Sequence, residues 1–382
     1  VTAFSNDDLV VEGGTLTELV SSAGDTVWTG TFTATDDSTT NAKVKFADDA
    51  NYTDVTGNDG ATDVEAVAVV DTLSPDLAAS EIEITAANLN DATNTSVVTI
   101  TFTEAVTEFN NSDITVTGGT LSTVGSNDGG VTWTGIFTAS DDSTANGTIS
   151  IGTDYQDLVG NVGANGDTDS VVVDTTNPTA TVTFAQDGLD DDTNESLVTI
   201  VFSEAVANFS NADVNVVGGT LGTLTSTDQI TWTGTFTASD DSTEEASVTV
   251  IGEYEDGNGN IGATGADDTA TVDTTNPTAT IVFDKTSLKK ETGGDGADES
   301  VVTITFSEGV TAFSNDDLVV EGGTLTELTS NVSNTVWTGT FTATNDSTTN
   351  AKVKFADDAN YTDVTGNDGA TAVSYTHLTL PT

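Results

Sequence analysis

The sequence VTAFSNDDLVVEGGTLTEL occupies residues 1–19 and returns unchanged at residues 310–328. Variants of this segment lie between the two copies. The tetrapeptide GGTL begins at four positions, which are Gly13, Gly118, Gly218 and Gly322. A Trp-Thr-Gly tripeptide follows each GGTL in the same register, at Trp28, Trp133, Trp232 and Trp337. Chance does not produce such matches, so the sequence indicates tandem duplication of a unit of roughly 100 residues.

The third copy shows what kind of unit is repeated. It contains seven strand-length segments that are rich in Val, Ile, Thr and Phe, at 179–184, 197–202, 213–217, 220–225, 230–237, 246–251 and 269–272. Clusters of Gly, Asn, Asp and Ser separate these segments, and no window repeats its apolar residues with a helical period. Seven short strands with a Trp predict an all-β, seven-stranded, Ig-like Greek-key β-sandwich. We therefore expect tandem sandwiches in an elongated array.

The boundaries between units follow a Val-Asp-Thr tripeptide that leads to a proline, beginning at Val70, Val173 and Val272. We expect a repeat at 1–72 that lacks its first strands, complete repeats at 73–175 and 176–274, and a repeat at 275–373 that lacks its last strand. The final segment, 374–382, does not continue the repeat pattern and contains His377. We interpret it as a non-native tail, and we interpret the whole chain as a fragment.

The composition excludes several classes of function. The net charge is −55, with 62 acidic residues against seven basic ones. This charge repels nucleic acids and anionic membranes but attracts cations. The chain has no cysteine and only one histidine. Disulfides are therefore excluded, and zinc or copper sites in the repeats are disfavoured.

Four segments of the third copy resemble the bacterial immunoglobulin-like repeats of large surface adhesins of the RTX or Bap type. These segments are FSEAV at 202–206, SNADVNVVGGTL at 210–221, WTGTFTAS at 232–239 and DGNGN at 256–260. The resemblance extends over nearly the whole chain. It implies extender modules in a secreted or cell-surface protein, often with Ca²⁺ between the domains.

The predicted strand order gathers carboxylates where two repeats meet. Strands alternate in direction, so the loops after the first and fifth strands of one repeat lie at the same end as its exit linker. The loops after the second and sixth strands of the next repeat face the same joint. Without arginine, converging carboxylates need another cation, and flexibly placed oxygen ligands suit Ca²⁺. The candidate metal ligands are Asp71, Glu104 and Asp157 at the first joint; Asp174, Glu204 and Asp256 at the second; and Asp190, Asp192, Asp241, Asp273, Glu308 and Asp363 at the third.

Other interpretations of the same residues remain open. Acidic residues can simply keep a surface solvated, and an Asp-Asp-Ser sequence is common in turns. Trp232 and Phe236 are expected to pack in or near the core, although a tryptophan could also stack on a sugar. Burial of Trp133 and Trp232 would separate these two possibilities.

The function expected from the sequence is that of an extracellular stalk on a bacterial cell surface, with its joints stiffened by Ca²⁺. Its partners would be the neighbouring repeats, together with a host, neighbour-cell or surface ligand held by domains outside this segment. Neither nucleic acid nor a membrane span is expected. The alternative is that the repeats themselves bind a carbohydrate or a cell-surface protein. We do not expect an enzyme, because no copy holds a unique carboxylate pair or a nucleophile beside a base.

Overall fold

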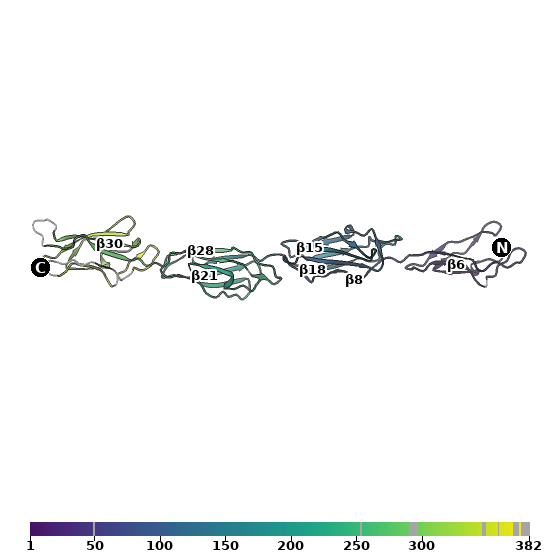
Figure 1. Ribbon diagram of the computed structural model, residues 1–382, viewed down its shortest axis with the longest axis horizontal. Coiled ribbons are helices and arrows are strands. Elements are labelled where there is room, and N and C mark those ends of the chain that lie inside the picture. Colours follow the sequence, from purple (N-terminus) through teal and green to yellow (C-terminus); the bar gives the residue numbers. More distant parts are fainter. Residues whose placement is uncertain are drawn as a thin grey trace. The chain divides into compact units, whose positions relative to one another are not determined.

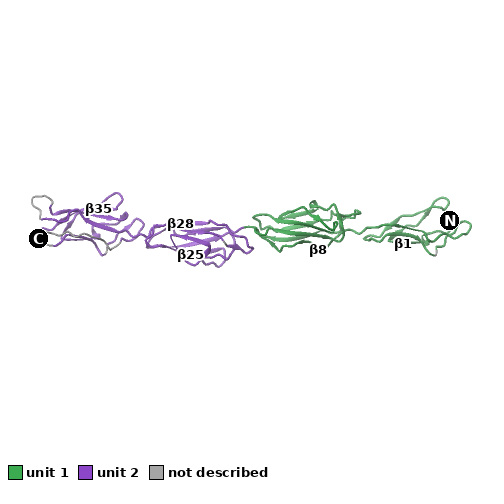
Figure 2. Cartoon of the chain, in the orientation of Figure 1, with its two compact units in different colours: residues 1–176 green, residues 177–382 purple. Residues whose placement is uncertain are grey.

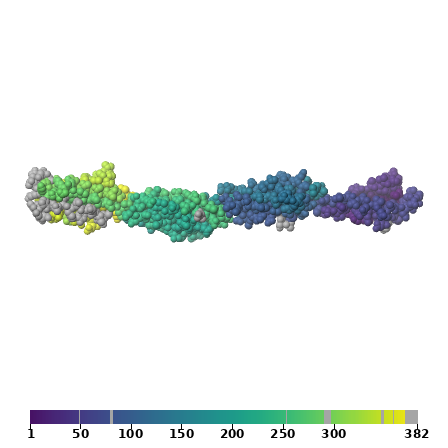
Figure 3. All heavy atoms as spheres, in the orientation of Figure 1, coloured from purple at the N-terminus to yellow at the C-terminus, as the bar shows by residue number. Residues whose placement is uncertain are grey.

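The computed structural model describes residues 1–48, 50–252, 254–289, 297–345, 349–357, 359–369 and 374–375. The chain divides into two compact units, 1–176 and 177–382, which are described separately here (Figure 2). Each unit contains two repeats. In the space-filling view each repeat keeps its own range of colours, because it folds from one continuous stretch of chain (Figure 3).

The first unit contains a partial and a complete sandwich (Figure 1). In the first repeat, β1 (Leu9–Glu12), β6 (Ala42–Phe46) and β7 (Glu65–Ala68) form one sheet, while β2 (Gly14–Leu16) pairs with β5 (Phe32–Ala34) and β3 (Val20–Ser21) with β4 (Trp28–Thr29). In the second repeat, one sheet has the order β13 (Gly119–Leu121), β15 (Thr132–Ala139), β10 (Thr95–Phe102), β8 (Leu77–Ile84), with β14 (Gly125–Ser126) also on β15. The other sheet has the order β12 (Ile114–Thr117), β16 (Gly147–Ile151), β18 (Asp167–Val173), β9 (Asn88–Leu89).

The second unit repeats this arrangement. In the third repeat, one sheet has the order β19 (Ala180–Phe184), β21 (Glu195–Phe202), β25 (Thr231–Ala238), β24 (Gly219–Leu221), and the other has the order β20 (Gly188–Leu189), β28 (Asp267–Val272), β26 (Ala246–Val250), β23 (Val214–Val217). In the fourth repeat, one sheet has the order β33 (Gly323–Leu325), β35 (Val336–Ala343), β30 (Glu299–Phe306), β29 (Ala279–Phe283), β38 (Ser374–Tyr375), with β34 (Thr329–Ser330) also on β35. A separate pair consists of β32 (Leu318–Glu321) and β36 (Lys352–Phe355).

Alternation along the strands produces the core. In β10 and β21, every second residue is buried, as expected for a sheet with one face on the core and the other in solvent. Val198, Ile200 and Phe236 of the third repeat are fully buried with Val248 and Val250 of the opposite sheet. The all-β, tandem Ig-like prediction is confirmed. Among the described residues the only helical elements are four 3₁₀ turns, η1 (Asn6–Asp8), η2 (Asn111–Asp113), η3 (Asn211–Asp213) and η4 (Asn315–Asp317).

The seven strands expected in the third repeat correspond to β19, β21, β23, β24, β25, β26 and β28. Sequence patterns did not reveal the two-residue strands β20, β22 (Val206–Ala207) and β27 (Glu255–Asp256), because so short a segment has no measurable alternation. Gly218 has φ +75°, the left-handed conformation expected of the GGTL turn. A Cβ on Gly219 would lie 2.2 Å from the Thr237 carbonyl oxygen, so no larger residue fits there.

Two residues of the segment 374–382 are described. Ser374–Tyr375 forms β38 and pairs with β29 in parallel. The interpretation of the segment as a non-native tail stays a prediction. Unpaired backbone groups at the edge of β29 offer hydrogen bonds to any extended segment that reaches them, whatever its side chains. His377 and the other residues of the segment lie outside the described residues.

Candidate metal centre

Two short strand pairs place the acidic side chains. In the fourth repeat, β31 (Val310–Thr311) pairs with β37 (Thr362–Asp363), with Val310 opposite Asp363. Glu308 precedes β31 by two residues and therefore lies beside Asp363. In the second repeat, β11 (Val106–Thr107) pairs with β17 (Gln156–Asp157) in the same register, which brings Glu104 to Asp157.

The linker supplies a third carboxylate to each pair. In the first unit, carboxylate oxygens of Asp71, Glu104 and Asp157 all lie within 4.8 Å of one another. In the second unit, the same distance limit holds for Asp273, Glu308 and Asp363. We call each set a carboxylate trio. The residues expected at the second joint belong to different units. Asp174 lies at the end of the first unit, whereas Glu204 and Asp256 lie in the second. There Val206 pairs with Asp256, as Val310 pairs with Asp363.

A five-residue loop holds the buried carboxylate of each trio. Asp363 is 1% exposed. Its Oδ1 accepts hydrogen bonds from the backbone N–H groups of Thr365 (2.8 Å), Gly366 (2.7 Å) and Asn367 (3.0 Å), and its Oδ2 accepts one from the Asn367 side chain (2.8 Å). Asp157 makes the equivalent bonds with the loop that ends at Asn161. Because these donors come from its own loop, the Asp side chain is fixed without any ligand.

The asparagine at the end of this loop connects it to the preceding repeat. Asn367 is fully buried, and its Nδ2 donates to the Asp273 carbonyl oxygen at 2.8 Å. Its Oδ1 accepts a hydrogen bond from the Asp191 backbone N–H at 2.6 Å. In the first unit, Asn161 donates to the Asp71 carbonyl oxygen at 3.2 Å. The sequence analysis missed both asparagines, although the recurrent Asn at the end of DGNGN and YTDVTGN was a visible signal.

The threonine of each Val-Asp-Thr motif fixes the other end of the linker. Thr274 Oγ1 donates to the Ser239 carbonyl oxygen at 2.7 Å and accepts from the Ser242 backbone N–H at 3.0 Å. Thr72 makes the same contacts with Thr35 and Ser38 in the first repeat. The Asp-Asp-Ser turns therefore hold the exit linker of their own repeat, which accounts for their recurrence without a metal.

The electrostatic environment differs sharply within each trio. Burial raises the pKa of Glu308 above its ordinary 4.5, and the nearby charges of Asp363 and Asp273 raise it further. Burial likewise raises the pKa of Glu104, assisted by the charges of Asp71 and Asp157. Burial also acts to raise the pKa of Asp363, but hydrogen bonds from Asn367 and Thr365 outweigh it, so that the pKa falls below the ordinary 3.8. The buried Asp of the trio thus favours its charged form, whereas the pKa of the neighbouring Glu is shifted towards its protonated form.

The atoms of the trios fit a hard cation. Three carboxylates provide oxygen ligands, and Ca²⁺ takes six to eight oxygens, with carboxylates, carbonyls and waters all acceptable. Glu104 Oε1 and Asn276 Oδ1 are buried without a hydrogen-bond partner. Both atoms can only accept, so a bound cation would satisfy a carboxylate oxygen such as Glu104 Oε1 where no donor is present.

Three other predicted ligands lie in turns of the third repeat. Asp190 Oδ1 accepts hydrogen bonds from the Thr193 backbone N–H (2.6 Å) and Oγ1 (2.8 Å), which closes the local turn. Asp192 is exposed. Asp241 is exposed at φ +48°, in the turn that leads to Ser242. Asp190 nevertheless lies beside the trio, because it lines a hollow of about 250 Å³ together with Asp273 and Thr365. Metal binding by Asp190, Asp192 and Asp241 stays a prediction.

The aromatic residues divide into two groups. Phe236 is fully buried, as expected for core packing. Trp133 and Trp232 pack against the cores but remain partly exposed. Burial of these tryptophans therefore does not by itself separate core packing from a stacking surface.

The sequence of every repeat matches one family. The family described as Bacterial Ig-like domain matches residues 1–70, 71–173, 174–272 and 273–379. The chain belongs to this family. No curated protein sequence matches the four bacterial Ig-like repeats.

Several solved structures are similar to these bacterial Ig-like repeats at low identity. Invasin, described as a bacterial integrin-binding protein, is 13% identical, with a TM-score of 0.31, over 76% of this chain and 59% of its own. InvD of Yersinia pseudotuberculosis is 15% identical, with a TM-score of 0.29, over 73% of this chain and 84% of its own. The adhesin InvE of the same organism is 15% identical, with a TM-score of 0.23, over 68% and 72%. The chain thus spans less than two thirds of the invasin structure. In the described part of the repeats, no helix is long and apolar enough to cross a membrane.

Proposed function

We propose that these bacterial Ig-like repeats form part of an extracellular adhesin stalk on a bacterial cell surface, and that Ca²⁺ bound by the carboxylate trios stiffens its joints. One observation carries this proposal. In each carboxylate trio, a linker Asp, a Glu after the second long strand and a buried loop Asp bring carboxylate oxygens within 4.8 Å of one another. The RTX or Bap type of adhesin is part of the same proposal.

The linker contacts explain how such a joint would act. Thr274 fixes the start of the linker to the third repeat, and Asn367 fixes the Asp273 carbonyl from the fourth. The Thr278 backbone accepts from the Ser307 N–H at 2.8 Å, which fixes the end of the linker. Few free torsions remain between these anchors. Two carboxylates 4 Å apart repel by about 4 kcal/mol at an effective dielectric of 20, and a bound Ca²⁺ would convert this repulsion into attraction between the linker and the next repeat.

The experiment compares thermal unfolding of the full chain in millimolar Ca²⁺ and in chelator. A ligand at 100 times its Kd stabilises the folded state by about 2.7 kcal/mol. We expect the transition of the fourth repeat to move up in Ca²⁺ and this shift to disappear in Glu308→Gln. Asp192→Asn is the matched control, since it also removes one carboxylate but leaves the trio intact, and it should retain the whole shift.

Small-angle scattering tests the mechanical part of the proposal. The radius of gyration should rise when Ca²⁺ is added to chelated protein, and the rise should be smaller in a Glu104→Gln, Glu308→Gln double variant. Equal thermal shifts in Glu308→Gln and Asp192→Asn would mean that Ca²⁺ acts only as a general counterion. Unchanged scattering would separate calcium binding from stiffening and would refute the stalk mechanism.

A further inference from the structure

A second feature of the repeats lies on their flank, away from the linkers. Each repeat packs a Phe edge-on against its Trp with ring centroids 5.3 Å apart, in the pairs Phe4–Trp28, Phe109–Trp133, Phe209–Trp232 and Phe313–Trp337. Phe313 is buried, whereas Trp337 remains partly exposed. The four repeats therefore share one aromatic frame with part of the indole accessible.

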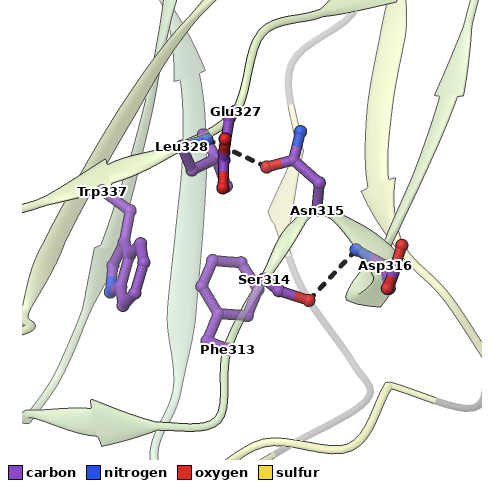
Figure 4. A pocket seen from close by; sticks show the side chains of 7 residues that line it. All are labelled: Phe313, Ser314, Asn315, Asp316, Glu327, Leu328 and Trp337. Atoms are coloured by element: carbon purple, nitrogen blue, oxygen red, sulfur yellow. Dashed lines mark hydrogen bonds between the residues drawn. The ribbon is translucent and has the colours of Figure 1, made fainter.

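In the fourth repeat this frame lines a surface hollow of about 360 Å³, which we call the Trp337 hollow (Figure 4). Its other lining residues are Ser314, Asn315, Asp316, Glu327 and Leu328. Asn315 accepts from the Leu328 backbone N–H (2.9 Å) and donates to the Thr326 carbonyl (3.0 Å), so its amide is committed to the fold. The first repeat has a corresponding hollow of about 320 Å³ lined by the same seven residue types around Trp28.

Only these two repeats carry two acidic residues at the hollow. Asp316 and Glu327 are exposed, and none of the ion pairs among the described residues involves either of them. Asp7 and Glu18 hold the same positions in the first repeat. The second repeat has Ser112 and Thr123 there, and the third has Ala212 and Thr223. The aromatic frame thus forms without the acidic side chains, which are not required for folding.

We propose that the Trp337 and Trp28 hollows bind an arginine side chain of a partner protein. A cation over an indole face gains about 0.5–2 kcal/mol. A guanidinium is planar, so it can stack on Trp337 while an N–H edge donates to Glu327, and Asp316 at the opposite side of the hollow adds negative charge (Figure 4). The weak hydration of a guanidinium favours such a site over an ammonium. This chain contains no arginine, so a second copy of it cannot supply the group. The partner is therefore a different protein with an exposed arginine.

The test follows the indole N–H signals of the four tryptophans in isotope-labelled full chain by NMR. A Gly-Ser-Arg-Ser-Gly peptide is titrated in saturating Ca²⁺, so that the carboxylate trios are already occupied. The signals of Trp28 and Trp337 should shift, while those of Trp133 and Trp232 should not. A peptide with citrulline in place of arginine keeps the planar shape without the charge and should give no shift.

Exchanges between repeats make the test specific. Asp316→Ser with Glu327→Thr gives the fourth repeat the residues of the second, and it should weaken the Trp337 response about tenfold or more while Trp28 still responds. Ser112→Asp with Thr123→Glu should create a response at Trp133. An unchanged Trp337 response in the first variant, or an equal response to a lysine peptide or to citrulline, would overturn the proposal.

Discussion

Within each trio, one Asp and one Glu have opposite protonation preferences although they lie side by side. Asp363 is surrounded by donors from its own loop and keeps its charge. Glu308 has the charges of Asp363 and Asp273 beside it, and its pKa is raised. On the proposed function, a proton and Ca²⁺ would therefore compete for Glu308.

The competition predicts a pH dependence with two separate windows. In chelator, the raised pKa of Glu308 means that protonation favours the folded state, so its contribution to stability is lost as pH rises above 4.5 through the folded pKa. The lowered pKa of Asp363 has the opposite effect, and its contribution is lost as pH falls below 3.8. Melting temperatures in chelator between about pH 4 and pH 7 should therefore fall for the fourth repeat, and Glu308→Gln should flatten that decline. A decline of the same size in Glu308→Gln would assign it to the rest of the acidic surface.

At the scale of elements, the loop that follows the sixth long strand is the part that connects two repeats. Its Asp holds the loop closed and its terminal Asn reaches across to the linker carbonyl. The same loop occurs in the first repeat as Asp54–Asn58, where Asp54 accepts from Thr56 and Asn58 but the residues are exposed. The chain thus contains a buried and an exposed version of one loop.

Comparing the two versions gives a prediction. Asn367→Ala removes the side-chain hydrogen bonds to Asp363 Oδ2 and to the Asp273 carbonyl oxygen, where water has little access, and this costs about 1–3 kcal/mol. Asn58→Ala removes the equivalent loop hydrogen bonds where water can replace them and should cost well under 1 kcal/mol. Urea unfolding of the full chain, followed by the fluorescence of Trp337 and Trp28, measures both changes. Similar losses would mean that the loop acts only within its own repeat.

At the scale of the whole molecule, the cores and the carboxylate trios are distributed over the repeats. Each described core cluster contains residues of a single repeat. The two described trios share no residue, and each is built by a different pair of repeats. Interactions that share no partners usually contribute additively to stability.

The calcium stoichiometry should therefore decrease in single steps. Isothermal calorimetry of the full chain should show one ion fewer in Glu104→Gln, one fewer in Glu308→Gln and two fewer in the double variant, with additive losses of thermal stabilisation. Loss of both sites in a single variant would show that the joints bind cooperatively.

The sequence by itself determined the repeat, the sandwich and the class of side chain at the joints, because duplication, strand alternation and strand order are properties of the linear chain. Tertiary structure decided which acidic residues meet. The two-residue pairing of β31 with β37 brings Glu308 to Asp363, and Asp190 lines a hollow with Asp273 and Thr365, whereas Asp192 and Asp241 lie exposed in turns although their chemistry is the same. The roles of Asn161 and Asn367 also required the fold, since their partners lie about 90 residues away along the chain. Contacts at that separation leave no periodic signal in a single sequence.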